Sequence, residues 1–188
     1  MRVSRIQAEK NRQTVIDVAS RLFREHGFDG IGLKDLMKGA GLTQGAFYKQ
    51  FASKEDLVAQ ASRRAVESTA ARWATATAAN PRDPLGAVMA FYLSMGHREQ
   101  RMDGCPVAAL CSDAARQGAE VKGSFEAGIK QYLEIIGRLI GEEPNSKAMA
   151  ILSTMVGALT LSRVVNDPDL AQAFLDAAAE QVRDAVTA

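Results

Sequence analysis

The chain has 188 residues, of which 47% are hydrophobic and 24% charged, with a formal net charge of +1. This length can bury a substantial core and suits one large or two small domains. No apolar stretch approaches the roughly 18 residues that a membrane-spanning helix needs, and the N-terminus lacks the apolar segment of a signal peptide. We therefore expect a cytoplasmic protein that does not enter the membrane.

The two parts of the chain differ in charge. Residues 1–54 carry a net charge of +5, whereas residues 55–188 carry −4. A basic N-terminal third beside an acidic remainder indicates that only one end meets nucleic acid. We expect a DNA-binding domain over residues 1–54 and a second helical domain over residues 55–188.

The first predicted helix runs from about Gln7 to His26. Gly27 ends it, because glycine readily adopts the positive φ that terminates a helix. Apolar residues recur at helical spacing along one face and form its predicted buried stripe: Val15, Ala19, Leu22 and Phe23.

Two short helices joined by a tight turn are predicted next. The first covers about Leu33 to Gly39, and Gly41 supplies the turn. Thr43 is the expected N-cap of the second, which begins near Gln44, extends towards Lys49 and turns its apolar side inward. This arrangement is a helix-turn-helix pattern, in which the second helix enters the major groove of DNA.

The outer face of the second short helix carries small, amide and cationic groups, which suit base edges and phosphates. Gly45 costs about 1 kcal/mol in a helix relative to alanine, but it allows backbone to approach DNA closely. The residues expected at base edges are Thr43, Gln44, Gly45 and Ala46. Those expected at phosphates are Lys34, Tyr48, Lys49 and Lys54.

The remaining chain is predicted to be helical throughout. Ser53 caps a long helix to about Ala79, and Asp-Pro pairs open two later helices, at Asp83 and Asp167. The other predicted helices cover about 84–101, 106–117, 120–140, 146–166 and 168–186. No strand pattern appears, so the predicted fold class is all-α with about nine helices.

Four motifs give this sequence a resemblance to a known family. They are RLFREHGF (21–28), AGL (40–42), GAFY (45–48) and FASKEDL (51–57). As a set they resemble the DNA-binding domain of the TetR family of bacterial transcriptional regulators, over about residues 10–58. The resemblance implies a homodimeric regulator, most often a repressor, that a small molecule releases from a palindromic operator.

The resemblance also implies roles for the second half of the chain. In TetR-like regulators the last two helices pair with their copy in a dimer, and the middle helices enclose a small-molecule cavity. Aromatic and methionine side chains suit adaptable apolar ligands. The candidate ligand-binding residues are Met89, Tyr92, Met95, Met102, Leu110, Phe125, Ile129 and Tyr132.

One alternative is a regulator that senses oxidants or electrophiles through Cys105. This cysteine precedes Pro106 at a helix start, where the thiol pKa can fall. Cys111 is expected only to pack, and His97 to lie at a solvated helix end.

A second alternative is a protein-interaction module that keeps the fold without binding DNA. Gly32, Met37 and Gln50 depart from the family's pattern and leave this alternative open. An enzyme is not expected, because the sequence has no phosphate-binding loop, nucleophile motif or metal-ligand spacing. No cofactor or metal is expected either.

Overall fold

The computed structural model describes residues 4–143 and 145–187. These residues form ten α-helices and one short 3-10 helix, with no strand among them. The elements are α1 (Arg5–His26), α2 (Leu33–Gly39), α3 (Gln44–Phe47), α4 (Lys54–Ala79), α5 (Pro84–Tyr92), α6 (Met95–Glu99), η1 (Arg101–Asp103), α7 (Pro106–Ala114), α8 (Ala119–Ile140), α9 (Ser146–Val164) and α10 (Pro168–Thr187). The all-α prediction is confirmed.

Capping side chains fix the helix ends that the sequence indicated. The Ser53 hydroxyl accepts a hydrogen bond from the backbone N–H of Asp56 at 3.0 Å and starts α4. Asp83 caps α5 in the same way, and Asp167 caps α10. Gly27 ends α1 at φ +77°. These short-range signals act through local geometry, so the sequence alone reveals them.

The predicted single helix over residues 84–101 is wrong. α5 ends at Tyr92, Leu93 leaves helical geometry at ψ +46°, and a second helix begins after Ser94. The Ser94 hydroxyl accepts from the N–H of His97 at 3.1 Å and caps α6. Serine competes for nearby backbone groups in this way, and here the competition splits one helix into α5, α6 and η1.

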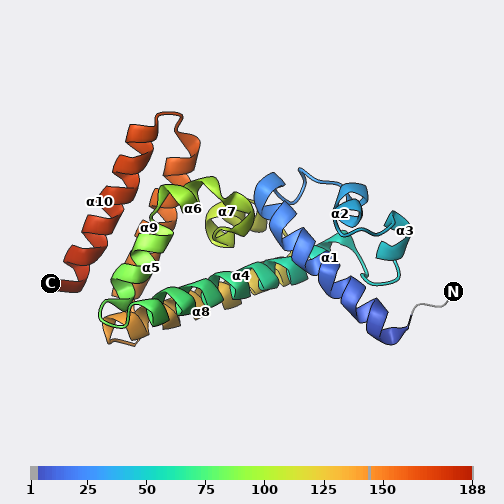
Figure 1. The fold of residues 1–188 in the computed structure, drawn as a ribbon, viewed down its shortest axis with the longest axis horizontal. Coiled ribbons are helices and arrows are strands. Elements are labelled where there is room, and N and C mark those ends of the chain that lie inside the picture. The colour runs from blue at the N-terminus through green and yellow to red at the C-terminus, as the bar shows by residue number, and fades with distance from the viewer. Residues whose placement is uncertain (1–3, 144, 188) are drawn as a thin grey trace.

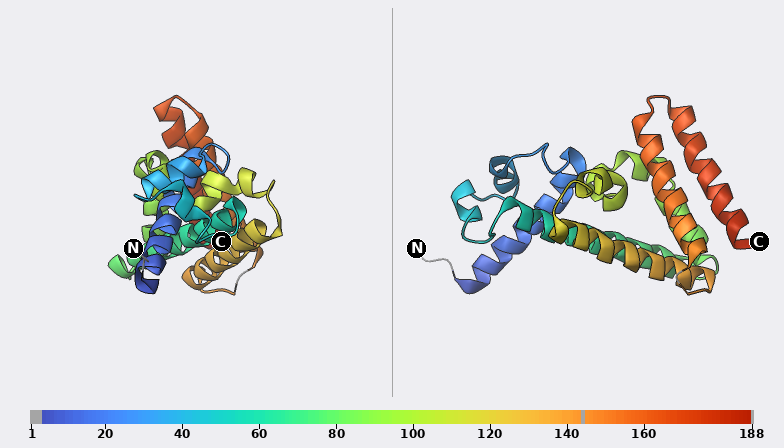
Figure 2. Two further views of the ribbon diagram at one scale, coloured as in Figure 1. Left: turned by 90° about the vertical axis from the view of Figure 1, so that its right-hand side faces the viewer. Right: turned by 180° about the vertical axis from the view of Figure 1, so that it is seen from behind.

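The helices are arranged along one long axis (Figure 1). α1, α2 and α3 form an N-terminal bundle at one end, and α9 and α10 form a hairpin at the other. α4 and α8 run side by side between the two ends, as both face-on views show (Figures 1 and 2). We call α4–α10 the body.

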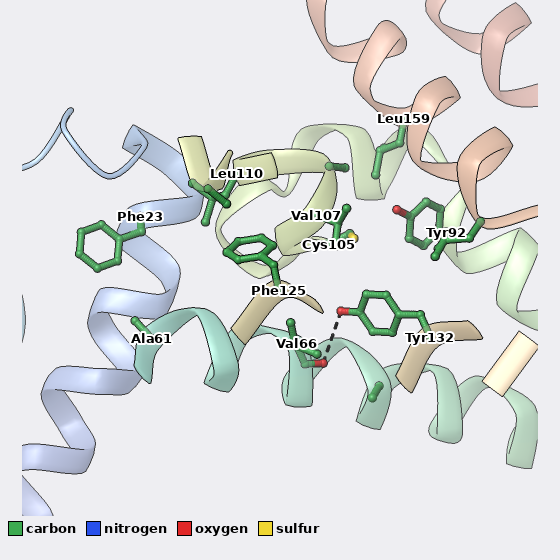
Figure 3. Close-up of a cluster of buried hydrophobic side chains, with 14 of the residues drawn as sticks. Phe23, Ala61, Val66, Tyr92, Cys105, Val107, Leu110, Phe125, Tyr132 and Leu159 are labelled. Carbon is green, nitrogen blue, oxygen red and sulfur yellow. Dashed lines mark hydrogen bonds between the residues drawn. The ribbon is translucent and has the colours of Figure 1, made fainter. Parts of the chain in front are cut away.

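Close packing joins α4 to α8. A Cβ added to Gly128 would lie 2.6 Å from a Val66 methyl carbon, so the two helices approach more closely there than a side chain would allow. The Tyr132 hydroxyl reaches the Val66 carbonyl at 3.5 Å (Figure 3). The ring of Tyr132 lies 5.0 Å from the ring of Trp73. This region is the centre of the body's core.

Polar and cation–π contacts join α1 to α4. Arg64 pairs with Asp17 at 2.6 Å, and Arg12 donates to Gln60 at 2.6 Å. The Arg12 guanidinium also lies 5.2 Å from the centre of the Phe51 ring. The N-terminal bundle is therefore held on the first half of α4.

α9 is the one helix among the described residues that is long and apolar enough to cross a membrane. This rests on length and composition only, and a buried core helix can have the same properties. α9 carries few charged residues over its 19 positions, and this gives it its apolar composition. α9 packs against α8 and α10, yet Leu161 and Val164 on it remain 48% and 72% exposed.

His97 is buried, with 5% of its surface exposed, and does not lie at a solvated helix end as expected. Its Nε2 accepts from the N–H of Cys105 at 2.9 Å, so Nδ1 carries the proton and donates to the Tyr92 carbonyl at 2.7 Å. Burial, together with the cationic Arg163, Arg72 and Arg24, lowers the pKa of His97 to about 4, and the hydrogen bond to the Tyr92 carbonyl opposes this only in part.

This buried histidine predicts an acid-sensitive fold. The unfolded chain takes up a proton on His97 below pH 6.5, whereas the folded chain takes it up only near pH 4. The free energy of unfolding should therefore fall as the pH drops from about 6.5 to 4, by up to about 3 kcal/mol from this residue.

Urea unfolding at several pH values would measure this loss. In His97→Gln the free energy of unfolding should vary less with pH between about 6.5 and 4. His26→Gln, at an exposed site, should show the same pH dependence as the unaltered protein. The same pH dependence in His97→Gln and in the unaltered protein would contradict the assignment.

Candidate functional site

α3 is held in place by one buried aromatic side chain. Phe47 is fully buried and stacks on Phe51, with ring centroids 5.4 Å apart. The Tyr48 ring meets the edge of Phe47 at 5.3 Å but is itself 68% exposed. Since Phe47 fills the core of the N-terminal bundle, the opposite side of α3 is fixed towards solvent.

The turn between α2 and α3 has the predicted geometry. Gly41 adopts φ +70°, a conformation that glycine reaches without strain. The N–H of Leu42 donates to the Met37 carbonyl at 2.9 Å and closes the turn. Thr43 is the N-cap of α3, as predicted, but its side chain makes no capping hydrogen bond. The two short helices thus form a helix-turn-helix unit.

α3 is shorter than the sequence suggested. The helix covers only Gln44–Phe47, and Tyr48 continues into a turn that ends before Phe51. The predicted rod from Gln44 to Lys49 is therefore one helical turn followed by a hydrogen-bonded turn. The N–H of Gln50 donates to the Phe47 carbonyl at 2.8 Å and stabilises this continuation.

Most of the residues predicted to meet DNA are exposed to solvent. Thr43, Gln44, Gly45, Tyr48 and Lys49 are exposed, and Ala46 is half-buried. Lys34 is exposed on α2. Lys54 is half-buried in the first turn of α4, beside the acidic Glu55 and Asp56. Their roles at bases and phosphates stay a prediction.

Gly45 lies beside empty space. A Cβ built on it would meet no atom within 4 Å, so nothing inside the protein requires a glycine there. Glycine in a helix costs stability relative to alanine. The close approach of DNA to the backbone at Gly45 stays a prediction.

An apolar groove of about 660 Å³ lies between α7, α8 and α9. We call it the α7–α8 groove. Its lining residues are Cys111, Ala114, Ala115, Lys122, Phe125, Glu126, Ile129, Lys130, Leu133 and Met149. The floor is apolar, and charged side chains from α8 stand at its edges.

Only two of the predicted ligand-binding residues, Phe125 and Ile129, line this groove. Met89, Tyr92, Leu110 and Tyr132 are buried in the core, and Met95 and Met102 are half-buried away from the groove. Lys122, Lys130 and Met149 also line the groove but were not among the predicted ligand-binding residues. The amphipathic spacing of α8 could have indicated the two lysines, but only the fold brings α9 beside them.

A chain of aromatic rings connects the groove to the N-terminal bundle. The Phe125 ring lies 6.5 Å from Phe28, which lies 5.5 Å from Phe23 on α1. The Asp113 carboxylate of α7 accepts a hydrogen bond from the N–H of Phe28 at 3.1 Å. Both walls of the groove thus contact the segment that follows α1.

The two cysteines differ from the prediction in their burial and in the thiol pKa expected for Cys105. Cys105 is 1% exposed, and burial raises the pKa of its thiol, which is opposite to the expected lowering at a helix start. Cys111 is an exposed free thiol in the α7–α8 groove and not a packing residue. Within the described ranges, no group of three His, Cys, Asp or Glu residues could hold a metal ion.

Comparison with known proteins agrees with this geometry. Residues 15–61 match the model described as bacterial regulatory proteins, tetR family. The chain is 39% identical to the transcriptional regulator AcrR of Shigella flexneri over 59 residues, which is 31% of this chain and 27% of that protein. It is 29% identical to the transcriptional repressor KstR2 of Mycobacterium tuberculosis over 99 residues, 51% of this chain and 50% of the relative.

These matches span between about a quarter and a half of the relatives' length. Among solved structures, a TetR transcriptional regulator from Chloroflexus aurantiacus superposes with a TM-score of 0.80. The superposition covers 97% of this chain and 96% of that one, at 24% sequence identity. The fold is therefore shared over nearly the whole length.

The empty space at Gly45 gives a direct test of the interface. Gly45→Leu should leave the melting temperature equal or higher, because the side chain meets nothing and helix propensity rises. DNA affinity, measured by fluorescence anisotropy, should fall at least about fivefold, since a clash at one close contact costs about 1 kcal/mol or more.

The matched control is Gly123→Leu, a helical glycine on α8 whose added Cβ also meets nothing. This variant should bind DNA normally. Equal DNA affinity for the two variants would contradict the assigned face.

Proposed function

Because the chain belongs to the TetR family of bacterial regulatory proteins, we propose that it is a DNA-binding transcriptional regulator that acts as a repressor. A homodimer binds a palindromic operator through the outer face of α3, and a small apolar effector releases it. Binding of two half-sites one helical turn apart gives the sequence specificity that a single short helix lacks.

The observation that carries this proposal is the orientation of α3. Phe47 anchors the helix from inside, so Gln44, Gly45 and Lys49 face outward from a rigid support. Thr43, Gln44, Gly45 and Ala46 would face base edges, and Lys34, Tyr48, Lys49 and Lys54 would hold phosphates. Phosphate contacts position the protein, and base contacts specify the sequence.

The exposed face of α9 and α10 supports a dimer. Leu161 on α9 and Leu170 on α10 are each about half exposed, although they are large and apolar. Gly157 on α9 has open space around it, which allows a second helix to approach closely. Water-exposed apolar surface on two adjacent helices favours burial against a second copy of the hairpin.

The α7–α8 groove is the proposed effector site. Its apolar floor and its volume of about 660 Å³ suit a small, largely apolar molecule. An effector that displaces Phe125 would move Phe28 and, through Phe23, the end of α1. The spacing of the two N-terminal bundles in a dimer would then no longer match the spacing of the operator half-sites. Coupling between such sites is typically about 1–3 kcal/mol.

The two alternatives differ in what supports them. Redox sensing through Cys105 loses its main physical argument, because burial raises the thiol pKa. A protein-interaction module remains the rival to DNA binding. Gly32 caps α2 without a side chain and Met37 is fully buried. The side-chain oxygen of Gln50 has no hydrogen-bond partner among the residues that the structure describes.

Lys54 tests the phosphate contacts. Lys54→Ala should weaken binding to specific and random DNA alike and reduce the slope of log K against log salt by about one unit. Anisotropy titrations at several salt concentrations measure both. Arg82→Ala removes one positive charge from the exposed segment between α4 and α5, and it should change neither the affinity nor the salt dependence. A loss limited to one operator sequence would contradict a phosphate role, and no DNA binding by the unaltered protein would favour the rival.

Leu161 tests the dimer. Leu161→Glu places a charge on the exposed face of α9 and should give a folded monomer by light scattering, because an unpaired charge would otherwise be buried in the interface. Gln131→Glu adds the same charge at an exposed site on α8 and should remain dimeric. A monomeric unaltered protein, or a dimeric Leu161→Glu, would contradict the proposed interface.

A further inference from the structure

A second, smaller pocket of about 210 Å³ lies where α1 meets the body. Four elements contribute to it, which are the end of α1, η1, α7 and α9. Its lining residues are Arg24, Glu25, Gly27, Arg101, Ala108, Ala109, Thr160, Arg163 and Val164. We call it the arginine pocket.

The lining has an excess of positive charge. Three guanidinium groups, from Arg24, Arg101 and Arg163, face a single carboxylate, that of Glu25. No ion pair within 4.0 Å joins Glu25 to any of them among the residues described. The nearby Asp103 carboxylate is already shared between Arg21 at 3.0 Å and Arg72 at 3.8 Å.

Two of these arginines are held by backbone carbonyls instead of carboxylates. Arg24 is 4% exposed and donates to the carbonyls of Ser20 at 2.9 Å and Gly104 at 2.8 Å. Arg163 donates to the carbonyls of Arg98 at 3.2 Å and His97 at 2.8 Å. Carbonyl oxygens fix the orientation of a guanidinium but leave its charge without a counterion.

One donor of the pocket is left without a partner. The Nη1 atom of Arg163 is buried and makes no hydrogen bond within the described part of the chain. A buried charged donor without an acceptor is costly, so an acceptor in the pocket would be bound favourably once the Arg163 side chain turns this nitrogen towards it. Burial also lowers the pKa of both Arg24 and Arg163, and the nearby carboxylates of Asp103 at Arg24 and Glu25 at Arg163 offset this only in part.

From this geometry we propose that the arginine pocket binds a small oxyanion, a carboxylate or phosphate group with a short apolar body. Guanidinium groups bind such groups through paired, charge-assisted hydrogen bonds. Ala108, Ala109 and Val164 provide the apolar wall. The volume equals that of about seven waters, which limits the ligand to a few non-hydrogen atoms beyond the anionic group.

The position of the pocket gives the ligand a regulatory role, and this part rests on the proposed DNA-binding function. An anion between Arg24 on α1 and Arg163 on α9 joins the N-terminal bundle to the dimer-forming end of the body. It therefore favours one orientation of the two parts and changes DNA affinity.

Isothermal titration calorimetry without DNA tests the binding itself. Sodium phosphate and sodium butyrate are titrated at constant ionic strength, with sodium chloride and the neutral butyramide as controls. Binding of either oxyanion, without binding of chloride or butyramide, is the expected result, and the one that binds identifies the group. Butyramide binding as tight as that of butyrate, or no binding of either oxyanion, would overturn the proposal.

Two variants change the affinity in opposite directions. Arg101→Ala, at an exposed arginine, should weaken oxyanion binding about tenfold, and Glu25→Gln should tighten it by a similar factor, because it removes the repelling charge. Arg116→Ala, at an arginine outside the pocket, should change nothing. Unchanged affinity in both pocket variants would overturn the site.

The regulatory role has a separate measurement. Adding the bound oxyanion should change the DNA affinity of the unaltered protein and not that of Arg101→Ala. An unchanged DNA affinity in the presence of bound oxyanion would overturn this role alone. Absence of DNA binding under all conditions would instead contradict the proposed function, while the calorimetry would still decide the pocket.

Discussion

The structure depends on one helix that belongs to both of its parts. α4 has 26 residues, and Leu57, Val58 and Ala61 in its first half are buried where α1 crosses it, whereas Val66 and Trp73 are buried in the body. The rise of about 1.5 Å per residue makes it roughly 39 Å long. A single hydrophobic core runs along it, so the N-terminal bundle and the body cannot pack independently. The boundary predicted at residues 54–55 stays a prediction, and it coincides with the start of this shared helix.

The sequence was sufficient for the features that local chemistry decides. The cap at Ser53, the Asp-Pro helix starts and the positive φ of Gly27 and Gly41 all follow from short-range geometry. The inward side of α3 could also be predicted, since apolar spacing there identifies Phe47. The helix-turn-helix unit was therefore predictable in outline, although the length of α3 was not.

The remaining features depend on contacts between distant residues. His97 looked solvated in the sequence, yet the fold brings the N–H of Cys105 and the carbonyl of Tyr92 to its two nitrogens. Methionines and aromatics at helical spacing looked equally suited to a pocket or a core, and only the packing distinguishes Tyr92 from Phe125. Nothing in the sequence around Arg24 and Arg163 indicated that these side chains would be buried, because they are buried only where α1 packs against the body.

The two proposed ligand sites therefore both contact the region at the end of α1. The α7–α8 groove reaches the segment after α1 through Phe125 and Phe28, and the arginine pocket reaches the end of α1 through Arg24. The proposed regulator would thus respond to two ligands of different chemistry, one apolar and one anionic. Both act on the position of the N-terminal bundle relative to α9 and α10, which would set the spacing of the two bundles in a dimer.

Hydroxyl-radical footprinting on the DNA upstream of the protein's own gene tests the central claim most directly. The outward side of α3, duplicated by a two-fold dimer, should protect two symmetric patches on one face of the duplex, about one helical turn apart. Protection should be lost when α3 carries Gly45→Leu. An unprotected duplex, or a single patch without two-fold symmetry, would contradict the account.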